Sequence, residues 1–283
     1  MVGRFFLFGL GFSGRVIARR LAEAGWRVTA TTRSGEAVAC SGEAANCPGI
    51  QVLPFDRDHP LPAGCLDGVD AVLSSVPPDA AGDPVLDRMA GAIAAASPAW
   101  IGYLSTTGVY GDHGGAWVDE ATPPNPSLER SRRRLAAETR WRDLGAHIFR
   151  LAGIYGPGRS AVDTVRAGQA RRVVKPDQVF SRIHVEDIAG AVQASLGRPH
   201  PGTVYNLCDD DAAPPQEVIL HACRLLGVEP PPEIPWDVAR ETLSPMALSF
   251  YADNKRVHNG RMKQELGIRL KYPSYREGLA DCL

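Results

Sequence analysis

Apolar and polar positions in the first part of the chain follow two alternating periods. Residues 5–8 form a short apolar run that ends in glycines, and the apolar positions of 16–24 then recur at helical spacing. Gly25 ends that helix, and a second run of β-forming residues spans 26–30. A strand, a glycine turn, a helix and a strand within about thirty residues make the smallest βαβ unit.

The same alternation continues to residue 207. The pattern predicts strands over 50–55, 71–75, 100–104, 147–151 and 203–207, and helices over 89–96, 135–144 and 184–196. Strands that alternate with helices imply a parallel sheet that is covered on both faces. We therefore predict an α/β fold with a Rossmann-type, doubly wound parallel sheet.

The rhythm changes after Gly153. A turn at 155–158 precedes a basic stretch, and prolines at 214–215 and 230–232 mark loops in a mostly helical C-terminal part. The prediction is a dinucleotide-binding domain and a smaller interleaved substrate-binding region. The first comprises 1–152 and about 183–207, and the second comprises about 153–182 and 208–283.

Composition narrows the class of partner. The chain has 283 residues, 44% of them hydrophobic and 22% charged, and a formal net charge of -1. Nothing in that balance steers it toward nucleic acid or a membrane surface, and no segment approaches the roughly 20 apolar residues of a membrane span. The six cysteines are scattered, without metal-ligand spacing, so we expect reduced thiols and no metal site. These features predict a cytoplasmic protein.

The glycine turn carries the clearest chemistry. Gly9, Gly11 and Gly14 form a G-x-G-x-x-G pattern that follows a strand and opens a helix. The first glycine makes the tight turn, the second admits a pyrophosphate, and the third lets helix and strand pack closely. Phe12 and Ser13 begin the helix whose N–H groups would receive the pyrophosphate. The turn predicts a nicotinamide dinucleotide as cofactor.

The end of the second strand bears on the choice between NAD and NADP. An acidic residue there would hold the ribose 2′-hydroxyl, but this strand ends in Thr32, Arg33 and Ser34. An arginine beside hydroxyls favours the 2′-phosphate of NADP, although Arg33 as a solvated loop residue stays an alternative. Asp56 is positioned to meet the adenine or to cap the next turn. Ser75, at the end of the fourth strand, completes the predicted cofactor set.

Several further motifs occur in one order along the chain. They are Leu-Ser-Thr-Thr-Gly-Val-Tyr-Gly at 104–111, Arg-Leu-Ala-Gly-Ile-Tyr-Gly-Pro-Gly at 150–158, Arg-Ile-His-Val-Glu-Asp-Ile-Ala at 182–189, Tyr-Asn-Leu at 205–207 and Tyr-Pro-Ser-Tyr-Arg-Glu-Gly-Leu at 272–279. In these motifs the chain resembles the extended short-chain dehydrogenase/reductases, the NAD-dependent epimerase/dehydratase family, over essentially its whole length. The resemblance assigns Thr106 to the catalytic Ser/Thr position, whose hydroxyl bonds the reacting substrate oxygen. A plain strand-end threonine is the alternative.

The family's general acid/base is the tyrosine of a Tyr-x-x-x-Lys pair. Counting back from Leu135-Ala136-Ala137-Glu138 puts Arg134 at the lysine position and Arg130 at the tyrosine position. An arginine does not deprotonate in proteins, so Arg130 cannot act as the base, whereas Arg134 can still contact the ribose. The pattern is similar to the atypical subgroup that lacks this tyrosine, the bacterial YeeZ-like proteins. A solvated basic helix face is the alternative for both arginines.

Other side chains are candidates for the missing phenol and for the substrate pocket. Tyr110 is the nearest tyrosine to Thr106, though the family uses this position structurally, and His113 lies on the same loop. The resemblance places Tyr155 and His184 in motifs that shape the substrate pocket. Arg150, Arg159 and Arg182 could meet an anionic substrate or form structural ion pairs.

Two functions remain open at this stage. One is an NAD(P)-dependent oxidoreductase or epimerase that acts on a sugar, nucleotide sugar or other small carbonyl or alcohol. The other is a sensor that binds NADP without turnover, which would explain the missing tyrosine. A nucleic-acid binder is disfavoured because the Arg130–Arg134 run is short and lacks an aromatic platform. The resemblance also allows a homodimer.

Overall fold

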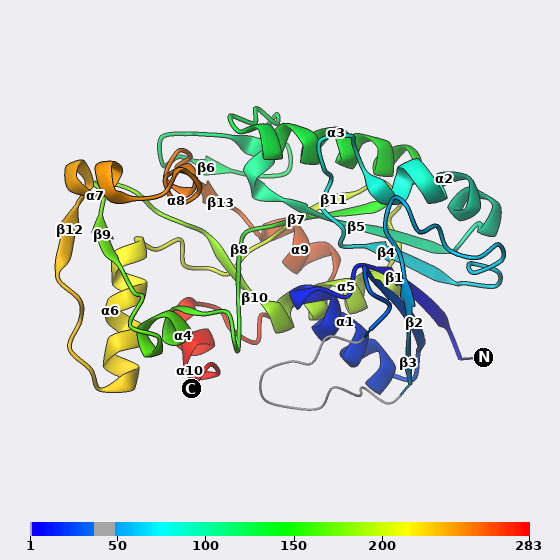
Figure 1. Ribbon diagram of the computed structural model, residues 1–283, viewed down its shortest axis with the longest axis horizontal. Helices are drawn as coiled ribbons and strands as arrows, with labels where there is room; N and C mark the ends of the chain where they lie inside the picture. Colours follow the sequence, from blue (N-terminus) through cyan, green and yellow to red (C-terminus); the bar gives the residue numbers. More distant parts are fainter. Residues whose placement is uncertain (1, 37–48) are drawn as a thin grey trace.

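A seven-stranded parallel sheet runs through the larger part of the molecule, in the order β11-β7-β5-β4-β1-β2-β3 (Figure 1). The computed structural model describes residues 2–36 and 49–283. The strands of this sheet are β1 (Arg4–Phe8), β2 (Arg27–Thr32), β3 (Ile50–Pro54), β4 (Ala71–Ser74), β5 (Trp100–Thr106), β7 (His147–Leu151) and β11 (Val204–Leu207). This order, with a reversal between β1 and β4, is that of a doubly wound Rossmann sheet, as the sequence predicts.

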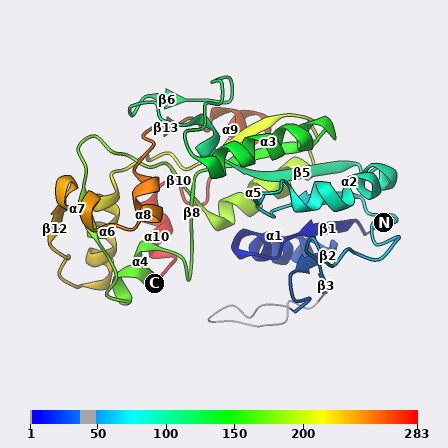
Figure 2. The same cartoon turned by 45° about the horizontal axis from the view of Figure 1, so that its top comes forward.

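Helices cover both faces of the sheet, which explains why its strands are continuously apolar. Figure 2 shows α1 (Phe12–Glu23) and α5 (Val185–Leu196) on one face, and α2 (Pro84–Ala96) and α3 (Glu129–Asp143) on the other. In β1, Phe5 and Leu7 join the core beneath α1 and α5. Successive side chains of a strand point to opposite faces, so Phe6 joins the second core beneath α2 and α3.

Two of these helices begin earlier than their apolar periodicity indicates. Helix α2 begins at Pro84 rather than at residue 89, because the Asp83 carboxylate accepts from the backbone N–H groups of Val85 and Leu86. Helix α3 begins at Glu129 rather than at 135, and its added turns carry mostly arginines. Apolar spacing alone does not detect a polar first turn.

A second, smaller region lies beside the sheet and contains α4, α6, α7, α8 and α10 (Figure 1). Its elements are α4 (Ala161–Arg166), β9 (Arg172–Val174), α6 (Pro215–Leu226), β12 (Glu233–Pro235), α7 (Trp236–Thr242), α8 (Pro245–Phe250) and α10 (Tyr275–Ala280). It has its own core, in which Tyr155, Val218 and Tyr275 pack together.

Short elements connect the two regions. They are the 3₁₀ turn η1 (Thr107–Tyr110), β6 (Trp117–Val118), β8 (Gly153–Tyr155), β10 (Arg182–His184), β13 (Arg256–Val257) and α9 (Gly260–Glu265). Strand β8 pairs with β10, and β13 pairs with β6, so chain segments distant in sequence meet between the regions.

The described cysteines, Cys65, Cys208, Cys223 and Cys282, are free thiols. Cys40 and Cys47, which enter the same prediction of reduced thiols, lie outside the described residues. Within residues 2–36 and 49–283, no helix combines the length and apolarity that crossing a bilayer requires.

Candidate functional site

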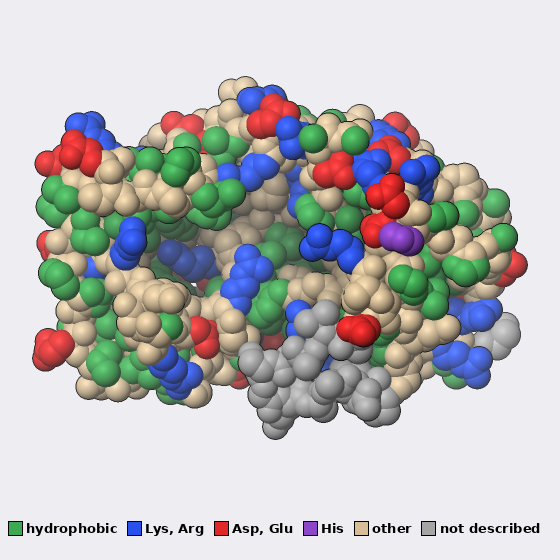
Figure 3. All heavy atoms as spheres, in the orientation of Figure 1, with side chains coloured by type: hydrophobic (Ala, Val, Ile, Leu, Met, Phe, Trp, Pro, Cys, Tyr) green, Lys and Arg blue, Asp and Glu red, His purple; other side chains and the backbone are tan. Residues whose placement is uncertain are grey.

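A cleft of about 720 Å³ opens at the carboxyl ends of the central strands. Ligands of doubly wound folds bind where the strand order reverses, here between β1 and β4. The glycine turn after β1, Ser75 after β4 and Thr106 at the end of β5 all line this cleft, and residues of the second region close its other side. Figure 3 shows Lys and Arg side chains gathered in and around the hollow at the middle of this face.

The glycine turn is held by hydroxyl groups from the neighbouring strands. Gly9 has a φ of 91°, a conformation that favours glycine. Its N–H donates to Oγ1 of Thr31 at 3.0 Å, and its carbonyl accepts from the Ser75 hydroxyl at 2.6 Å. A Cβ at Gly9 would lie 2.8 Å from that Ser75 oxygen. Thr31, buried in β2, is a contributor that the sequence motif does not reveal.

The turn fits a dinucleotide. A Cβ at Gly11 would meet nothing within 4 Å, so glycine leaves open space at the helix entrance. Gly11 also provides no side-chain cap, which leaves the first N–H groups of α1 available to an anion. A Cβ at Gly14 would collide with the carbonyl oxygen of Gly9, so the close contact of helix and turn requires glycine.

The predicted 2′-phosphate determinants form a tight turn after β2. The Thr32 hydroxyl donates to the carbonyl of Glu36 at 3.0 Å, and Oγ of Ser34 accepts from the Glu36 N–H at 3.3 Å. Arg33 is exposed on this turn and makes no hydrogen bond or ion pair with the described residues. Its guanidinium is therefore accessible to a ligand phosphate.

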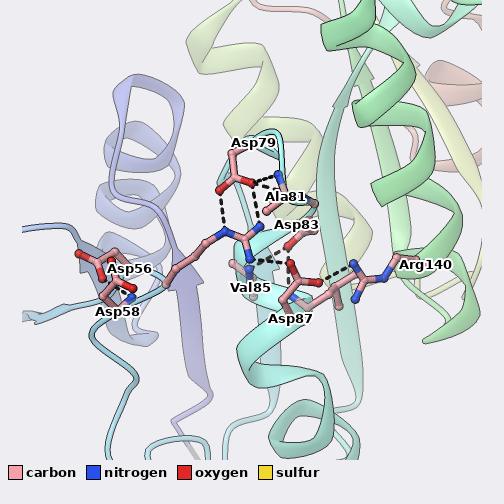
Figure 4. A network of polar contacts seen from close by, with 11 residues as sticks. Asp56, Asp58, Asp79, Ala81, Asp83, Val85, Asp87 and Arg140 are labelled. Carbon is pink, nitrogen blue, oxygen red and sulfur yellow. Dashed lines mark hydrogen bonds and ion pairs between the residues drawn. The ribbon is translucent and has the colours of Figure 1, made fainter.

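A second arginine, Arg57, follows β3 and forms ion pairs with two carboxylates. Arg57 donates from Nε to Asp79 at 2.6 Å and from Nη1 to Asp87 at 2.7 Å, and Arg140 donates to the other oxygen of Asp87 at 2.7 Å. The Arg57 guanidinium lowers the pKa of Asp79 to about 2. In Figure 4, Asp79 and Asp87 converge from the loop and helix that follow β4, and Arg140 approaches from the side of α3.

Asp56 performs the capping role that the sequence left open for it. Its carboxylate accepts from the backbone N–H groups of Asp58 and His59, both at 2.8 Å, and from the His59 ring at 2.9 Å. These bonds, led by the one from the His59 ring, lower the pKa of Asp56. Contact with an adenine stays a prediction.

Thr106 lies in the cleft with its hydroxyl proton available. As the N-cap of η1, its Oγ1 accepts from the Gly108 N–H at 3.1 Å. Its own O–H donates to none of the described residues, so it can donate to a ligand oxygen.

Arg130 and Arg134 occupy successive turns of one face of α3, and both line the cleft. Arg134 donates to the carbonyl of Leu104 at 2.9 Å and to the Tyr103 hydroxyl at 3.2 Å. Arg130 reaches α8, where Nη1 donates to Oγ of Ser249 at 2.6 Å. Its guanidinium also lies 5.2 Å from the Phe250 ring centroid. These two side chains are therefore not part of a merely solvated helix face.

The predictions that Tyr110 replaces the missing phenol and that Arg150 contacts the substrate are wrong, because both side chains lie in the core. Tyr110 is 0% exposed, and its hydroxyl donates to Oδ1 of Asn206 at 2.8 Å. Burial raises its pKa, which opposes a role as proton acceptor. Arg150 forms a buried ion pair with Glu138 at 2.6 Å and lies outside the cleft. The need to neutralise a buried charge explains its position.

Of the two residues that the resemblance places in the substrate pocket, one lines the cleft and the other does not. Tyr155 lines the cleft and a neighbouring cavity of about 630 Å³, and its hydroxyl donates to the carbonyl of Ser274 at 3.3 Å. His184 is fully buried and does not line the cleft, so this prediction is wrong. Its Nδ1 accepts from the Glu186 N–H at 3.3 Å and caps α5.

The C-terminal part supplies cleft residues that sequence reasoning missed. They are Ser249, Phe250, Asp253 and Lys255. No motif marks them, because α8 and β13 come close to Thr106 only through the packing of the two regions. Arg159 and Arg182 also line the cleft, and Arg182 donates from Nη1 to the carbonyls of Phe180 at 2.8 Å and Ala213 at 3.1 Å. Among the described residues, no group of His, Cys, Asp and Glu side chains could hold a metal ion.

Comparisons with known proteins agree with this architecture. Protein YeeZ of Escherichia coli K12 is 30% identical over 283 residues, which covers 94% of this chain and 95% of YeeZ. A solved structure of a conserved protein of unknown function from Silicibacter pomeroyi is 50% identical and superposes with a TM-score of 0.87, covering 99% of this chain and 97% of that one. No protein-family model matches the sequence.

More distant solved structures share the fold. MoeE5, in complex with UDP-glucuronic acid and NAD, is 18% identical and superposes with a TM-score of 0.78, covering 98% of this chain and 97% of MoeE5. At that identity the likeness concerns the fold. It is the Rossmann-type fold of the NAD-dependent epimerase/dehydratases.

Proposed function

This chain belongs to the YeeZ family, and from that premise we propose that it is an NAD(P)-dependent oxidoreductase of the extended short-chain dehydrogenase/reductase type. The substrate is a small carbonyl or alcohol compound, such as a sugar or nucleotide sugar. Residues 1–152 and 183–207 form the dinucleotide-binding part, and the remainder forms the substrate-binding part. One observation carries the proposal: a glycine turn that fits a dinucleotide lines the same cleft as Thr106, whose hydroxyl proton has no acceptor among the described residues.

The residues of the cleft divide into binding and orienting roles. The N-terminus of α1 holds the pyrophosphate, and Arg134, fixed on the Leu104 carbonyl, contacts the nicotinamide ribose. When bound, the nicotinamide supplies or accepts a hydride. Thr106 donates its hydroxyl proton in a hydrogen bond to the substrate oxygen and so orients the reacting carbon.

Arg130 occupies the position of the family's catalytic tyrosine and has a different role. A guanidinium stays protonated near neutral pH and therefore cannot accept a proton from the substrate. Its positive charge, together with those of Arg159 and Arg182, gives the cleft an excess of cations. An anionic substrate, with phosphate or carboxylate groups, suits this electrostatic environment.

NADP is the cofactor that the site favours. Arg33 is exposed beside the hydroxyls of Thr32 and Ser34, and no carboxylate stands at these three positions to repel a 2′-phosphate. The Arg33→Asp variant should reverse the preference, with NADP affinity falling about 10- to 100-fold because one charge-assisted contact becomes a repulsion. Thermal shifts at equal concentrations of NADP and NAD measure this, with Arg27→Asp, at the exposed start of β2, as the matched control.

Deuterium transfer tests the proposed reaction. The protein is incubated with NADPH deuterated at C4 and a panel of keto nucleotide sugars, 2-oxo acids and simple ketones. Mass spectrometry then detects deuterium in a product. Transfer to at least one compound, and its loss in Thr106→Val, is the expected result. Thr106→Ser should retain transfer because it keeps the hydroxyl.

A sensor without turnover is the second candidate, and the arginine at position 130 favours it. Tight NADP binding without deuterium transfer to any compound would support the sensor. The double variant Arg130→Tyr with Arg134→Lys restores the family's acid/base pair. Activity that appears only in this variant would show that the pocket is intact and that the natural chain lacks the proton donor.

A further inference from the structure

Lys255 is the one lysine that lines the cleft. The chain has four lysines, all within the described residues. Lys175 donates to the carbonyl of Tyr251, Lys263 pairs with Asp210, and Lys271 lies against the Tyr272 ring. Lys255 therefore differs from the other three in its access to a ligand in the same cavity as Thr106.

The backbone beside Lys255 is fixed by its neighbour, Asn254. The Asn254 N–H donates to Asp112 at 2.7 Å, and its carbonyl accepts from the N–H groups of His113 at 3.0 Å and Gly115 at 2.9 Å. Its side-chain oxygen also accepts from the Val179 N–H at 3.1 Å. The lysine thus projects from a rigid point, as a group with a defined chemical role requires.

One N–H group of the Lys255 ammonium has no acceptor among the described residues. Its Nζ donates to the Gly111 carbonyl at 2.7 Å and lies 3.5 Å from the Asp253 carboxylate. Asp253 is itself oriented by the Ser127 hydroxyl at 2.6 Å. An ammonium group has three N–H donors, so a third remains for a ligand in the cleft. The Lys255 and Asp253 side chains are only 10% and 11% exposed, which limits competition from water.

Lys255 and Thr106 are anchored at the two ends of one short turn. Thr106 caps the beginning of η1, and Gly111, the acceptor for Lys255, ends it. Four residues of 3₁₀ helix rise about 8 Å in total. Both groups line the same cleft, so a substrate oxygen bonded to the Thr106 hydroxyl can reach the Lys255 ammonium through one bridging water molecule.

Unlike an arginine, a lysine in this setting can exchange a proton. Burial lowers the pKa of Lys255, and the Asp253 carboxylate partly opposes that shift. A lysine whose pKa is lowered in this way serves as a general acid or base in enzymes. Other charged groups line the cleft or flank this lysine, and they come from α3, β10, the loops after β8 and η1, and its own segment. They are Arg130, Arg134, Arg159, Arg182, Asp112, His113 and Asp253.

We propose that Lys255 exchanges the proton of the reacting substrate oxygen, in the role that tyrosine has in related enzymes. This inference rests on the proposed function. In the reducing direction the carbonyl carbon gains a hydride from the reduced nicotinamide dinucleotide. The oxygen takes a proton from the bridging water while that water takes one from Nζ, and the electron pair of the broken N–H bond stays on the nitrogen. The neutral amine regains a proton from water, and Asp253 holds it in place throughout.

Nuclear magnetic resonance tests the lysine without any substrate. In protein labelled with ¹³C-lysine and saturated with NADPH, four side-chain signals are assigned by single Lys→Met substitutions. The Lys255 signal should titrate at lower pH than that of Lys271, whose pKa is raised by its bond with Tyr272. Asp253→Asn should lower the titration pH of Lys255 further. A Lys255 signal that titrates at or above that of Lys271 overturns the proposal.

Kinetics test the chemical role. With the panel compound that the wild type reduces fastest, Lys255→Met should lower kcat at least 100-fold and abolish the pH dependence assigned to this group, while KM changes little. Lys175→Met, outside the cleft, is the control and should behave as wild type. A Lys255→Met enzyme that changes only in KM overturns the proposal and leaves the proposed function intact. Absence of transfer by the wild type overturns both.

Discussion

Arg130 of α3 donates a 2.6 Å hydrogen bond from Nη1 to Oγ of Ser249 in α8, and so joins the two regions that line the cleft. The same guanidinium lies over the Phe250 ring, with 5.2 Å between its carbon and the ring centroid. Phe250 and Met246 are exposed apolar residues on this short helix. Arg130 therefore holds α8 beside the cavity.

Removal of this arginine should release α8 without unfolding the protein. In Arg130→Met, hydrogen exchange of residues 245–250 should accelerate at least several-fold, because the bonds to Ser249 are lost. The free energy of unfolding should change by less than about 1 kcal/mol, since Arg130 is exposed. Arg133→Met, which removes a pair with Glu129 on the same helix, is the control. Unchanged exchange in α8 would contradict the bridging role.

Alanine substitutions at two glycines of the turn should have different effects on stability. Gly11→Ala places a methyl group in open space, so the fold should keep its stability while NADP affinity falls at least 100-fold through obstruction of the pyrophosphate. Gly14→Ala drives a methyl group against the Gly9 carbonyl, so it should also lower the free energy of unfolding. Urea unfolding and calorimetric titration with NADP separate the two effects. Equal destabilisation by both variants would refute this distinction.

Removing one partner of the buried pair of Glu138 and Arg150 should destabilise the protein strongly. Glu138 accepts from Arg150 Nη2 at 2.6 Å and from the Ser105 hydroxyl at 2.8 Å. Glu138→Gln leaves an uncompensated buried guanidinium and should cost about 3 kcal/mol in urea unfolding.

The matched control for this ion pair lies on the same helix. Glu129→Gln removes the pairs of an exposed carboxylate with Arg132 and Arg133 and should cost less than about 0.5 kcal/mol. A Glu138 variant as stable as the Glu129 variant would argue against a buried charge pair.

Protonation of His184 should destabilise the protein below neutral pH. Burial lowers its pKa from 6.5 to about 4, although Asp281, 3.7 Å from Nε2, acts in the opposite direction. Between those two values the unfolded chain binds more protons than the folded one, so the free energy of unfolding falls as the pH falls. The full effect is on the order of 3 kcal/mol, from about 1.4 kcal/mol per pKa unit.

An asparagine at this position isolates the effect of the imidazole. Asparagine is a good N-cap residue, so His184→Asn should keep α5 capped while removing the titrating group. Urea unfolding between pH 7 and pH 4 should then show a shallower decline for the variant than for the wild type. Parallel declines would mean that other groups carry the pH dependence.

Local signals in the sequence determined the parallel sheet and the glycine turn of this protein. The apolar periods predict the parallel sheet, because each buried strand and helix face must be apolar whatever its partner. The G-x-G-x-x-G turn is equally local, since Gly9, Gly11 and Gly14 satisfy a requirement of the backbone itself. The spacing of the motifs predicts that Arg130 stands at the family's tyrosine position, and that assignment stays a prediction.

Only the tertiary structure decided which polar side chains reach the cleft. Tyr110, Arg150 and His184 occur in motifs that point to function, yet each lies in the core, where it bonds to Asn206, Glu138 and the start of α5 respectively. Lys255 occurs in no motif and lines the cleft. A side chain's distance from Thr106 depends on how the two regions pack, and long-range contacts of that kind leave no periodic trace in the chain.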